Sequence, residues 1–348
     1  MPMQNRDAEE VLKDAVRKGL LMMWQEENED HERHEGEYYP SSIGSCIRKQ
    51  YYEYTKPMPP SPETLAIFAT GEGVHEAVAE SLKRSGEVIV NHTELPIKLR
   101  ITEEIELSGR VDILLAEILG KKAVVEVKST SSIPSEPYES HMLQLQTYLH
   151  ALAIDTGFML YWDKRTGNIE SFMVKRDDIW LRRAGERVVI LHEHIKKKAP
   201  PIKEAFEEGR YWECDQCAYL DDCEPFSLLG VAKGSNIAVY GIEFQNGVII
   251  PEIKNISAKI INSKSQDNTV IILCDTDLQA SNVALYLKNE NIKYDLLYTK
   301  PQRFRSGIAW KLELIKRLSE RYRIRYFADS SQKVLELARP FVISSEAV

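Results

Sequence analysis

Two neighbouring runs of branched apolar residues limit the fold of this chain most strongly. The runs GRVDILLAE (109–117) and KKAVVEVKST (121–130) are separated by the turn LGKK (119–122). Short branched runs bounded by turns predict neighbouring strands. Apolar residues at helical spacing predict a helix over 61–86 that stops at Gly86, and helices over 141–154 and 177–198. We therefore expect an α/β fold in which helices precede, separate and follow the strands of a sheet.

The length of the chain indicates two domains. Its 348 residues, 43% of them apolar, can bury more than one ordinary core. A new alternation of strand and helix patterns starts near Asn236, and the segment 227–235 has the composition of a linker. We predict one domain over 1–230 and a second over 236–348.

The overall charge limits how the chain can bind nucleic acid. A formal net charge of -8 and a pI near 5.6 exclude a surface coated with basic residues. Any nucleic-acid contact is therefore expected at a local patch or a metal-lined cleft. No run approaches the roughly 18 apolar residues of a membrane helix, and the first residues are charged rather than signal-like. We expect a cytoplasmic protein without a membrane partner.

The two predicted strands carry an acid, an acid and a lysine. Asp112 lies in the first strand, and Glu126 and Lys128 lie in the second. Because side chains alternate along a strand, Glu126 and Lys128 share a face, while Val125 and Val127 point into the core. Two carboxylates can hold Mg2+ or Mn2+, and a lysine beside them can orient a water for in-line attack on a phosphodiester.

Three more polar residues accompany this pattern. His75 lies on the predicted helix upstream of the strands, and Gln144 and Tyr148 lie one turn apart on the helix downstream. Taken singly, His75 is compatible with an ordinary helix histidine, and Gln144 with Tyr148 is compatible with a half-buried helix face. In combination with the acids and the lysine, they favour a catalytic site.

The ordered set of His, Asp, ExK and QxxxY resembles the PD-(D/E)xK nuclease superfamily, and within it the RecB-like group. The resemblance covers roughly residues 40–226. It implies a restriction-endonuclease-like mixed sheet and a metal-dependent DNA exonuclease. It also implies a metal held by His75, Asp112 and Glu126, with the backbone carbonyl of Val127 as a further ligand.

The same resemblance assigns roles to the remaining motif residues. Lys128 corresponds to the catalytic lysine that assists the attacking water. Gln144 and Tyr148 correspond to the residues that position DNA on the substrate side of the site, and they count among the catalytic residues together with His75, Asp112 and Glu126.

Four of the five cysteines form a second pattern. Cys214, Cys217 and Cys223 have C-x2-C-x5-C spacing, and Cys46 lies in a similarly polar context. Such thiolates can hold an iron-sulfur cluster or a zinc ion, or can be structural without metal, and the spacing alone does not choose. Cys274 lies in the apolar run TVIILC and is expected to be a core residue.

One cysteine before a nuclease core and three after it resembles the CRISPR-associated RecB-like exonucleases. That resemblance implies an iron-sulfur cluster, with 4Fe-4S as the expected type, which ties the N-terminal part of the chain to the end of the nuclease core. The segment next to Cys46 contains Arg48, Lys49, Tyr51 and Tyr52. These residues suit single-stranded DNA, or alternatively ordinary packing and solvated charge.

The last third of the chain, from about residue 236, alternates apolar strands with amphipathic helices. This pattern predicts a small, Rossmann-like parallel sheet with helices on both faces. The order of its motifs is similar to the haloacid dehalogenase superfamily, with Lys311 and Asp329 at corresponding positions. However, Gly241 and Glu243 stand where that family has its two aspartates, and Ser330 replaces an acid. We expect a degenerate domain that binds DNA, a protein partner or a second copy of itself.

Three functional hypotheses follow from these patterns. The leading one is a DNA exonuclease that acts on single strands or DNA ends in recombination, repair or CRISPR adaptation. The alternatives are a DNA-binding scaffold that retains the nuclease fold, and a phosphatase centred on the last third of the chain. The basic segment KPQRFRSG, which contains Lys300, Arg303 and Arg305, could contact phosphates or form a solvated loop.

Overall fold

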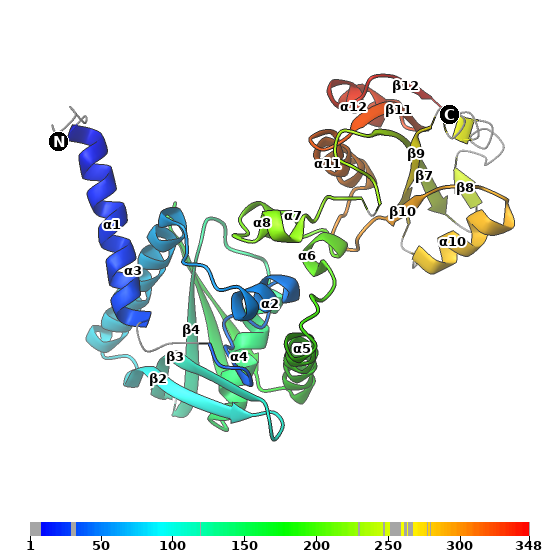
Figure 1. Ribbon diagram of the computed structural model, residues 1–348. Helices are drawn as coiled ribbons and strands as arrows, with labels where there is room; N and C mark the ends of the chain where they lie inside the picture. The colour runs from blue at the N-terminus through cyan, green and yellow to red at the C-terminus, as the bar shows by residue number, and fades with distance from the viewer. Residues whose placement is uncertain are drawn as a thin grey trace. The chain divides into compact units, whose positions relative to one another are not determined.

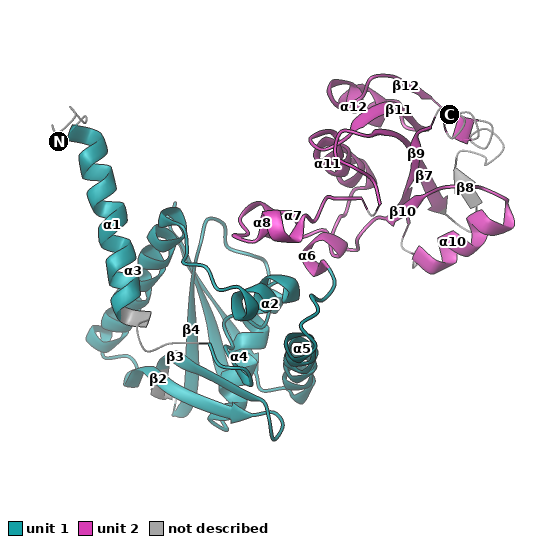
Figure 2. Cartoon of the chain, in the orientation of Figure 1, with its two compact units in different colours: residues 1–202 teal, residues 203–348 magenta. Residues whose placement is uncertain are grey.

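The chain divides into two compact units, Met1–Ile202 and Lys203–Val348, shown in different colours in Figure 2. A computed structural model describes residues 8–28, 33–118, 120–228, 230–245, 248–250, 259–260, 263, 267–276, 278 and 280–347. Leu119 of the predicted turn LGKK therefore lies outside the described residues. Each unit has a sheet of its own, so the expectation of an α/β fold is confirmed.

Unit 1 contains a mixed sheet with the strand order β1-β3-β4-β5-β6, and β2 pairs with β3. Figure 1 labels β2, β3 and β4 of this sheet. The pairs β1–β3 and β4–β5 are parallel, and the other pairs are antiparallel. The strands are β1 (Glu37–Tyr38), β2 (Ile89–Arg100), β3 (Glu106–Ile118), β4 (Lys121–Thr130), β5 (Thr156–Asp163) and β6 (Ile169–Lys175). The mixed sheet agrees with the predicted nuclease-like architecture.

The helices of unit 1 are α1 (Ala8–Asn28), α2 (Ile47–Thr55), α3 (Pro62–Ser85), α4 (Glu139–Ala151) and α5 (Asp178–Lys196). Strand β4 separates two cores. Val125 and Val127 pack with Val78 of α3, whereas Val124 packs with Leu145 of α4. Because α3 and α4 cover opposite faces of the sheet, β4 is buried on both sides, as a central strand with a parallel neighbour is expected to be.

The ends of α3 follow directly from local sequence. Ser61 caps the helix by accepting a hydrogen bond from the Thr64 N–H at 3.2 Å, and Pro62 occupies the first turn, where its missing N–H is not needed. Gly86 ends the helix in a left-handed conformation with φ of 69°. The predicted stop at Gly86 is therefore confirmed, and α3 carries His75 at a defined place along its length.

Unit 2 contains a sheet with the strand order β10-β9-β7-β11-β12, in which all of these neighbours are parallel, and β8 pairs antiparallel with β7. Its strands are β7 (Asn236–Gln245), β8 (Val248–Ile250), β9 (Thr269–Asp275), β10 (Leu296–Thr299), β11 (Arg323–Asp329) and β12 (Ser345–Ala347). Its longer helices are α10 (Ala280–Asn289), α11 (Gly307–Ser319) and α12 (Gln332–Ala338), and a 3-10 turn spans Arg339–Phe341. Cys274 lies fully buried on β9, as predicted for a core residue.

A buried ion pair lies at the end of the central strands of unit 2. The Lys311 Nζ of α11 is 2.8 Å from the Asp329 Oδ2 of β11, and both side chains are almost completely buried. A Cβ atom built on Gly241 of the neighbouring β7 would lie 1.7 Å from that same oxygen. The Asp329 carboxylate therefore occupies the space that a side chain at position 241 would need.

The segment that carries the three clustered cysteines packs within unit 2. It contains the short helices α6 (Glu204–Glu207), α7 (Tyr211–Asp215) and α8 (Leu220–Cys223). The Tyr211 ring contacts Phe304, and Arg317 of α11 forms an ion pair with Asp215. The division between the units thus precedes the predicted boundary at 227–235, because these contacts join the segment to α11 and to the loop before it. The predicted extent of the nuclease domain, 1–230, stays a prediction.

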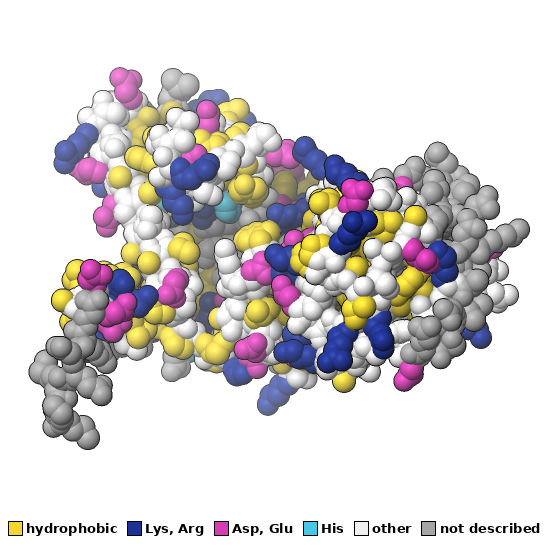
Figure 3. Space-filling model, turned by 90° about the horizontal axis from the view of Figure 1, so that it is seen from above, with side chains coloured by type: hydrophobic (Ala, Val, Ile, Leu, Met, Phe, Trp, Pro, Cys, Tyr) yellow, Lys and Arg dark blue, Asp and Glu magenta, His cyan; other side chains and the backbone are white. Residues whose placement is uncertain are grey.

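The surface carries charges of both signs. In the view of Figure 3, Lys and Arg side chains lie among Asp, Glu and hydrophobic side chains. This mixture agrees with the acidic net charge, which made a wholly basic face improbable.

Among the described residues, none of the helices has the length and hydropathy that crossing a bilayer requires.

Gly44 provides a test of the packing in unit 1. A Cβ atom at this position would lie 2.3 Å from the Ser140 Cα at the start of α4. Because backbone cannot move away as a side chain can, Gly44→Ala is expected to destabilise the protein by about 1–3 kcal/mol. Thermal and denaturant unfolding would measure this change.

Gly19 of α1 is the matched control, because nothing lies within 4 Å of a Cβ atom built on it. Gly19→Ala should be neutral or should stabilise the helix by up to about 1 kcal/mol. Equal stability of the two variants would contradict the close packing of Gly44.

Candidate metal centre and catalytic site

The strands β3 and β4 separate beside Asp112. Their ladder pairs Ile113 with Val125 as its last partners in this direction. Beyond this pair, the Asp112 Oδ2 accepts a hydrogen bond from the Val127 backbone N–H at 2.8 Å. A side-chain carboxylate thus takes the place of a ladder hydrogen bond, and it holds the two strands at a fixed separation while its other oxygen remains available.

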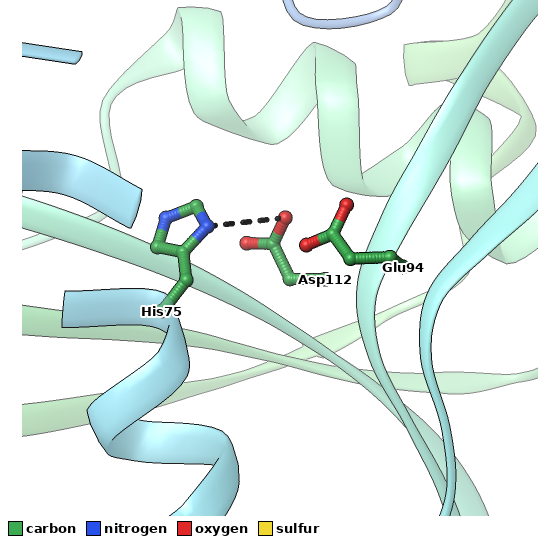
Figure 4. A group of neighbouring side chains, drawn as sticks. All are labelled: His75, Glu94 and Asp112. Carbon is green, nitrogen blue, oxygen red and sulfur yellow. Dashed lines mark ion pairs between the residues drawn. The ribbon is translucent and has the colours of Figure 1, made fainter. Parts of the chain in front are cut away.

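Three side chains from three elements meet at this fork (Figure 4). Ligand atoms of His75 on α3, Glu94 on β2 and Asp112 on β3 all lie within 4.8 Å of one another. The His75 Nδ1 is 3.7 Å from the Asp112 Oδ1. One imidazole nitrogen and two carboxylates are donors that suit a divalent cation such as Mn2+ or Mg2+. The structure therefore brings together His75 and Asp112, which the sequence had placed in one metal site.

Glu94 belongs to this group although the sequence gave no reason to select it. The register pairs Thr93 with Ile113 and Leu95 with Val111, so Glu94 lies opposite Asp112. Its backbone has a φ of 52°, which is uncommon for a residue other than glycine. Partial desolvation raises the pKa of Glu94, whose side chain keeps exposed surface, and the charge of Asp112 raises it further. The only signal available in the sequence was an acid in a predicted strand, and many other acids share it.

Glu126 is a buried acid beside the predicted catalytic lysine. Its side chain is 0% exposed, and the Lys128 Nζ lies 2.7 Å from its Oε1. Within the described residues, neither carboxylate oxygen has a hydrogen bond of good geometry. Burial raises the pKa of Glu126 to about 8, outweighing the opposite effect of Lys128. A buried carboxylate with so few partners fits a divalent cation, which would supply the missing charge and coordination.

The structure places Glu126 outside the three-residue group, although the charges of Asp112 and Glu94 both act on it. Val127 follows Glu126 in the strand, and its N–H is used by Asp112. The roles predicted for these residues, including the Val127 carbonyl as a ligand, remain predictions.

Gln144 and Tyr148 pair with each other on α4. The Gln144 Nε2 donates a hydrogen bond to the Tyr148 Oη at 3.0 Å, and both side chains are buried. Burial raises the pKa of Tyr148 strongly, and the charge of Glu126 adds to the effect. The pair shares one face of α4, as its helical spacing predicted, and the charge of Glu126 acts on Tyr148. Its predicted contact with DNA stays a prediction.

The predicted cluster ligands lie in both units. Cys46 is buried at the start of α2 in unit 1. In unit 2, the Cys214 backbone carbonyl accepts a hydrogen bond from the Cys217 N–H at 3.1 Å, so these two residues lie on one turn. Cys223 is the last residue of α8. Three thiols within ten residues of chain, on two short helices and the turn between them, are donors that suit iron or zinc.

Comparison with known proteins identifies similarity over the first two thirds of the chain. The family profile of the PD-(D/E)XK nuclease superfamily matches residues 4–224. The CRISPR-associated exonuclease Cas4 of Saccharolobus solfataricus is 23% identical over 208 residues, which cover 59% of this chain and 95% of that protein.

Two solved structures are similar at lower levels. The structure of SSO0001 has a TM-score of 0.45 at 21% identity, and the match covers 61% of this chain and 96% of that one. An alkaline exonuclease from Laribacter hongkongensis has a TM-score of 0.33 at 15% identity, and the match covers 47% of this chain and 93% of that one.

The burial of Glu126 predicts that metal-free protein loses stability as the pH rises. Its pKa is raised on folding from 4.5 to about 8, so the folded state holds a proton that the unfolded state releases between these values. In the presence of a chelator, the protein should therefore be less stable near pH 9 than near pH 5. Glu126→Gln should remove about 4 kcal/mol of this loss.

Urea unfolding at a series of pH values would measure the effect. Glu76→Gln, at an exposed position of α3, is the control and should follow the wild type. Identical pH dependence in the wild type and Glu126→Gln would contradict the burial of an ionisable carboxyl group. Added Mn2+ should recover stability at high pH in the wild type more than in Glu126→Gln.

Proposed function

Because the chain belongs to the PD-(D/E)XK nuclease superfamily, whose profile matches residues 4–224, we propose that it is a metal-dependent DNA exonuclease. The observation that carries this proposal is the convergence of His75, Glu94 and Asp112 within 4.8 Å, beside the buried Glu126 and its neighbour Lys128. The similarity to an exonuclease supports DNA ends as the substrate. The reaction is hydrolysis of a phosphodiester by water.

In this proposal the site residues have separate tasks. His75, Asp112 and Glu126 hold a Mg2+ or Mn2+ ion, with the Val127 carbonyl as a further ligand. Glu94, whose carboxylate lies within 4.8 Å of the ligand atoms of His75 and Asp112, supplies an additional ligand. When bound, this ion supplies a Lewis acid for the phosphate and lowers the pKa of a water molecule.

Lys128 and two residues of α4 act on the water and on the DNA. The Lys128 Nζ, 2.7 Å from Glu126, orients the attacking water and offsets negative charge as it develops on the phosphate. Gln144 and Tyr148, which hydrogen-bond to each other on α4, position the DNA strand.

We also propose that Cys46, Cys214, Cys217 and Cys223 hold an iron-sulfur cluster of the 4Fe-4S type. The support is the thiol donor set, together with the burial of Cys46 and Cys214. A cluster with one ligand far from the other three in sequence would close a long loop of chain, so its role is structural. Arg48, next to Cys46, donates a hydrogen bond to the Pro201 carbonyl at 2.6 Å, which orders the same part of unit 1.

The second unit is proposed to be a degenerate relative of the haloacid dehalogenases that binds DNA or a protein partner. Gly241 stands where that family has its nucleophile, and the Asp329 carboxylate fills the space beside it. Since no side chain fits at position 241, a phosphatase reaction at this place is disfavoured. We place the chain in the cytoplasm, in recombination, repair or CRISPR adaptation.

Replacement of Lys128 tests the nuclease activity. Lys128→Ala should lower cleavage of end-labelled DNA at least about 100-fold, because the ammonium group acts at the reacting phosphate. The assay uses single-stranded and double-stranded substrates with Mg2+ or Mn2+, and EDTA should abolish cleavage. Lys122→Ala is the matched control, since Lys122 is exposed on the same strand. Cleavage that survives in purified Lys128→Ala protein would refute the assignment.

Replacement of a cysteine tests the cluster separately. Cys214→Ala should lose the iron content and visible absorbance of anaerobically purified protein, whereas Cys274→Ala should retain both. Cys274 is the suitable control because it is fully buried in the sheet of unit 2. Colourless wild-type protein that contains zinc would remove the cluster and leave the nuclease proposal intact.

A further inference from the structure

A histidine outside the predicted motifs lies on the same helix as Gln144 and Tyr148. His141 precedes Gln144 by three residues and Tyr148 by seven, so the three share one face of α4. The crossover from β4 through α4 to the parallel β5 brings the start of α4 near the ends of these strands. Lys128 lies near the end of β4, and its register partner on β5 is Tyr161.

A short chain of hydrogen bonds connects the Tyr138 backbone, the Tyr161 hydroxyl and the His141 ring. The Tyr138 backbone N–H donates to the Tyr161 Oη at 3.1 Å, and the same hydroxyl lies 2.9 Å from the His141 Nδ1. Tyr161 is fully buried, so its hydroxyl proton needs an acceptor. Among the described residues, His141 Nδ1 is the acceptor in reach, which leaves the proton of the imidazole ring on Nε2.

The surroundings also keep both rings neutral. Burial lowers the pKa of His141 to about 3, and the positive charge of Lys128 lowers it further. Burial raises the pKa of Tyr161 to about 12, so its hydroxyl remains a donor. The hydrogen bond to Tyr161 uses Nδ1 alone, and Nε2–H is therefore a neutral donor on the face of α4 that carries Gln144 and Tyr148.

We propose that His141 is a substrate-binding residue whose Nε2–H donates a hydrogen bond to a phosphate oxygen of the DNA strand next to Lys128. This proposal rests on the proposed nuclease function. A neutral donor suits this place because a second positive charge beside Lys128 would be repelled by it and by a bound cation. A phosphate is the expected acceptor. In the proposed complex the reacting phosphate binds at the carboxylates, so the next phosphates along the DNA strand come close to α4.

The tautomer can be measured without activity. In full-length protein labelled with 15N-histidine, His141 should give the signals of a neutral ring protonated at Nε2 near neutral pH. Tyr161→Phe, which removes the proton donated to Nδ1, should shift these signals toward a mixture of tautomers. A ring protonated at Nδ1 or at both nitrogens in the wild type would overturn the proposal.

Binding of DNA measures the contact itself. In a Lys128→Ala background with Mn2+, His141→Phe should weaken binding of a single-stranded oligonucleotide about 10-fold, the effect of one hydrogen bond to a charged group. His141→Gln, which keeps an N–H donor, should stay within about threefold of the parent. His150→Gln is the control on the same helix, because the His150 nitrogens contact the Gln146 carbonyl and Asp178.

An oligonucleotide with a single neutral methylphosphonate distinguishes contact from structure. At one position along the strand, the methylphosphonate should weaken binding of the oligonucleotide to the parent Lys128→Ala protein. At that same position it should cause no further loss of binding to the variant that also carries His141→Phe. The contact would be refuted if the losses of affinity from the methylphosphonate and from His141→Phe were additive at every position. It would also be refuted if His141→Gln and His141→Phe lost equal affinity for the unmodified oligonucleotide. If the wild type fails to cleave DNA, the nuclease proposal fails, while this binding comparison still decides the role of His141.

Discussion

The hydrogen bond from the Val127 N–H to the Asp112 carboxylate is the contact on which the site of unit 1 depends. It bridges β3 and β4 where their ladder ends, and so sets the distance between the strand that carries Asp112 and the strand that carries Glu126 and Lys128. A buried backbone N–H must find an acceptor, and here a side chain that can also bind a cation provides it. Structural support and the proposed chemistry therefore use the same carboxylate.

Burial explains why this site is suited to a divalent cation. Glu126 has no exposed surface, and its neighbour Lys128 does not fully offset the desolvation of its carboxylate. An acid in such a place is unfavourable in the absence of a cation. The helix α4 faces these charges with neutral polar groups, Gln144, Tyr148 and His141, rather than with more cations. This arrangement leaves Lys128 as the positive charge beside the carboxylates, together with the cation proposed to bind them.

Unit 2 contains a buried ion pair that, unlike Glu126 and Lys128 of unit 1, has no role in the proposed reaction. Lys311 and Asp329 satisfy each other at 2.8 Å, and the space beside them at Gly241 is filled by the Asp329 carboxylate. This ion pair holds α11 against β11 and does not serve a reaction, because the ammonium and the carboxylate are each occupied by the other. The aromatic contacts of Tyr211 and the ion pair between Asp215 and Arg317 add the cysteine-bearing segment to this unit.

The sequence by itself determined the α/β class and the helix ending at Gly86, because caps and side-chain periodicity are local properties of a chain. The grouping of His75 with Asp112 was implied by the resemblance to a nuclease family and not by local spacing, since the two residues lie far apart in sequence. Tertiary structure alone decided the place of Glu94, since the register of β2 against β3 and a φ of 52° bring it opposite Asp112. It also decided that the segment from Lys203 packs in unit 2, and that the Tyr161 hydroxyl lies 2.9 Å from the His141 Nδ1. These features depend on contacts between residues far apart in sequence, which no local pattern records.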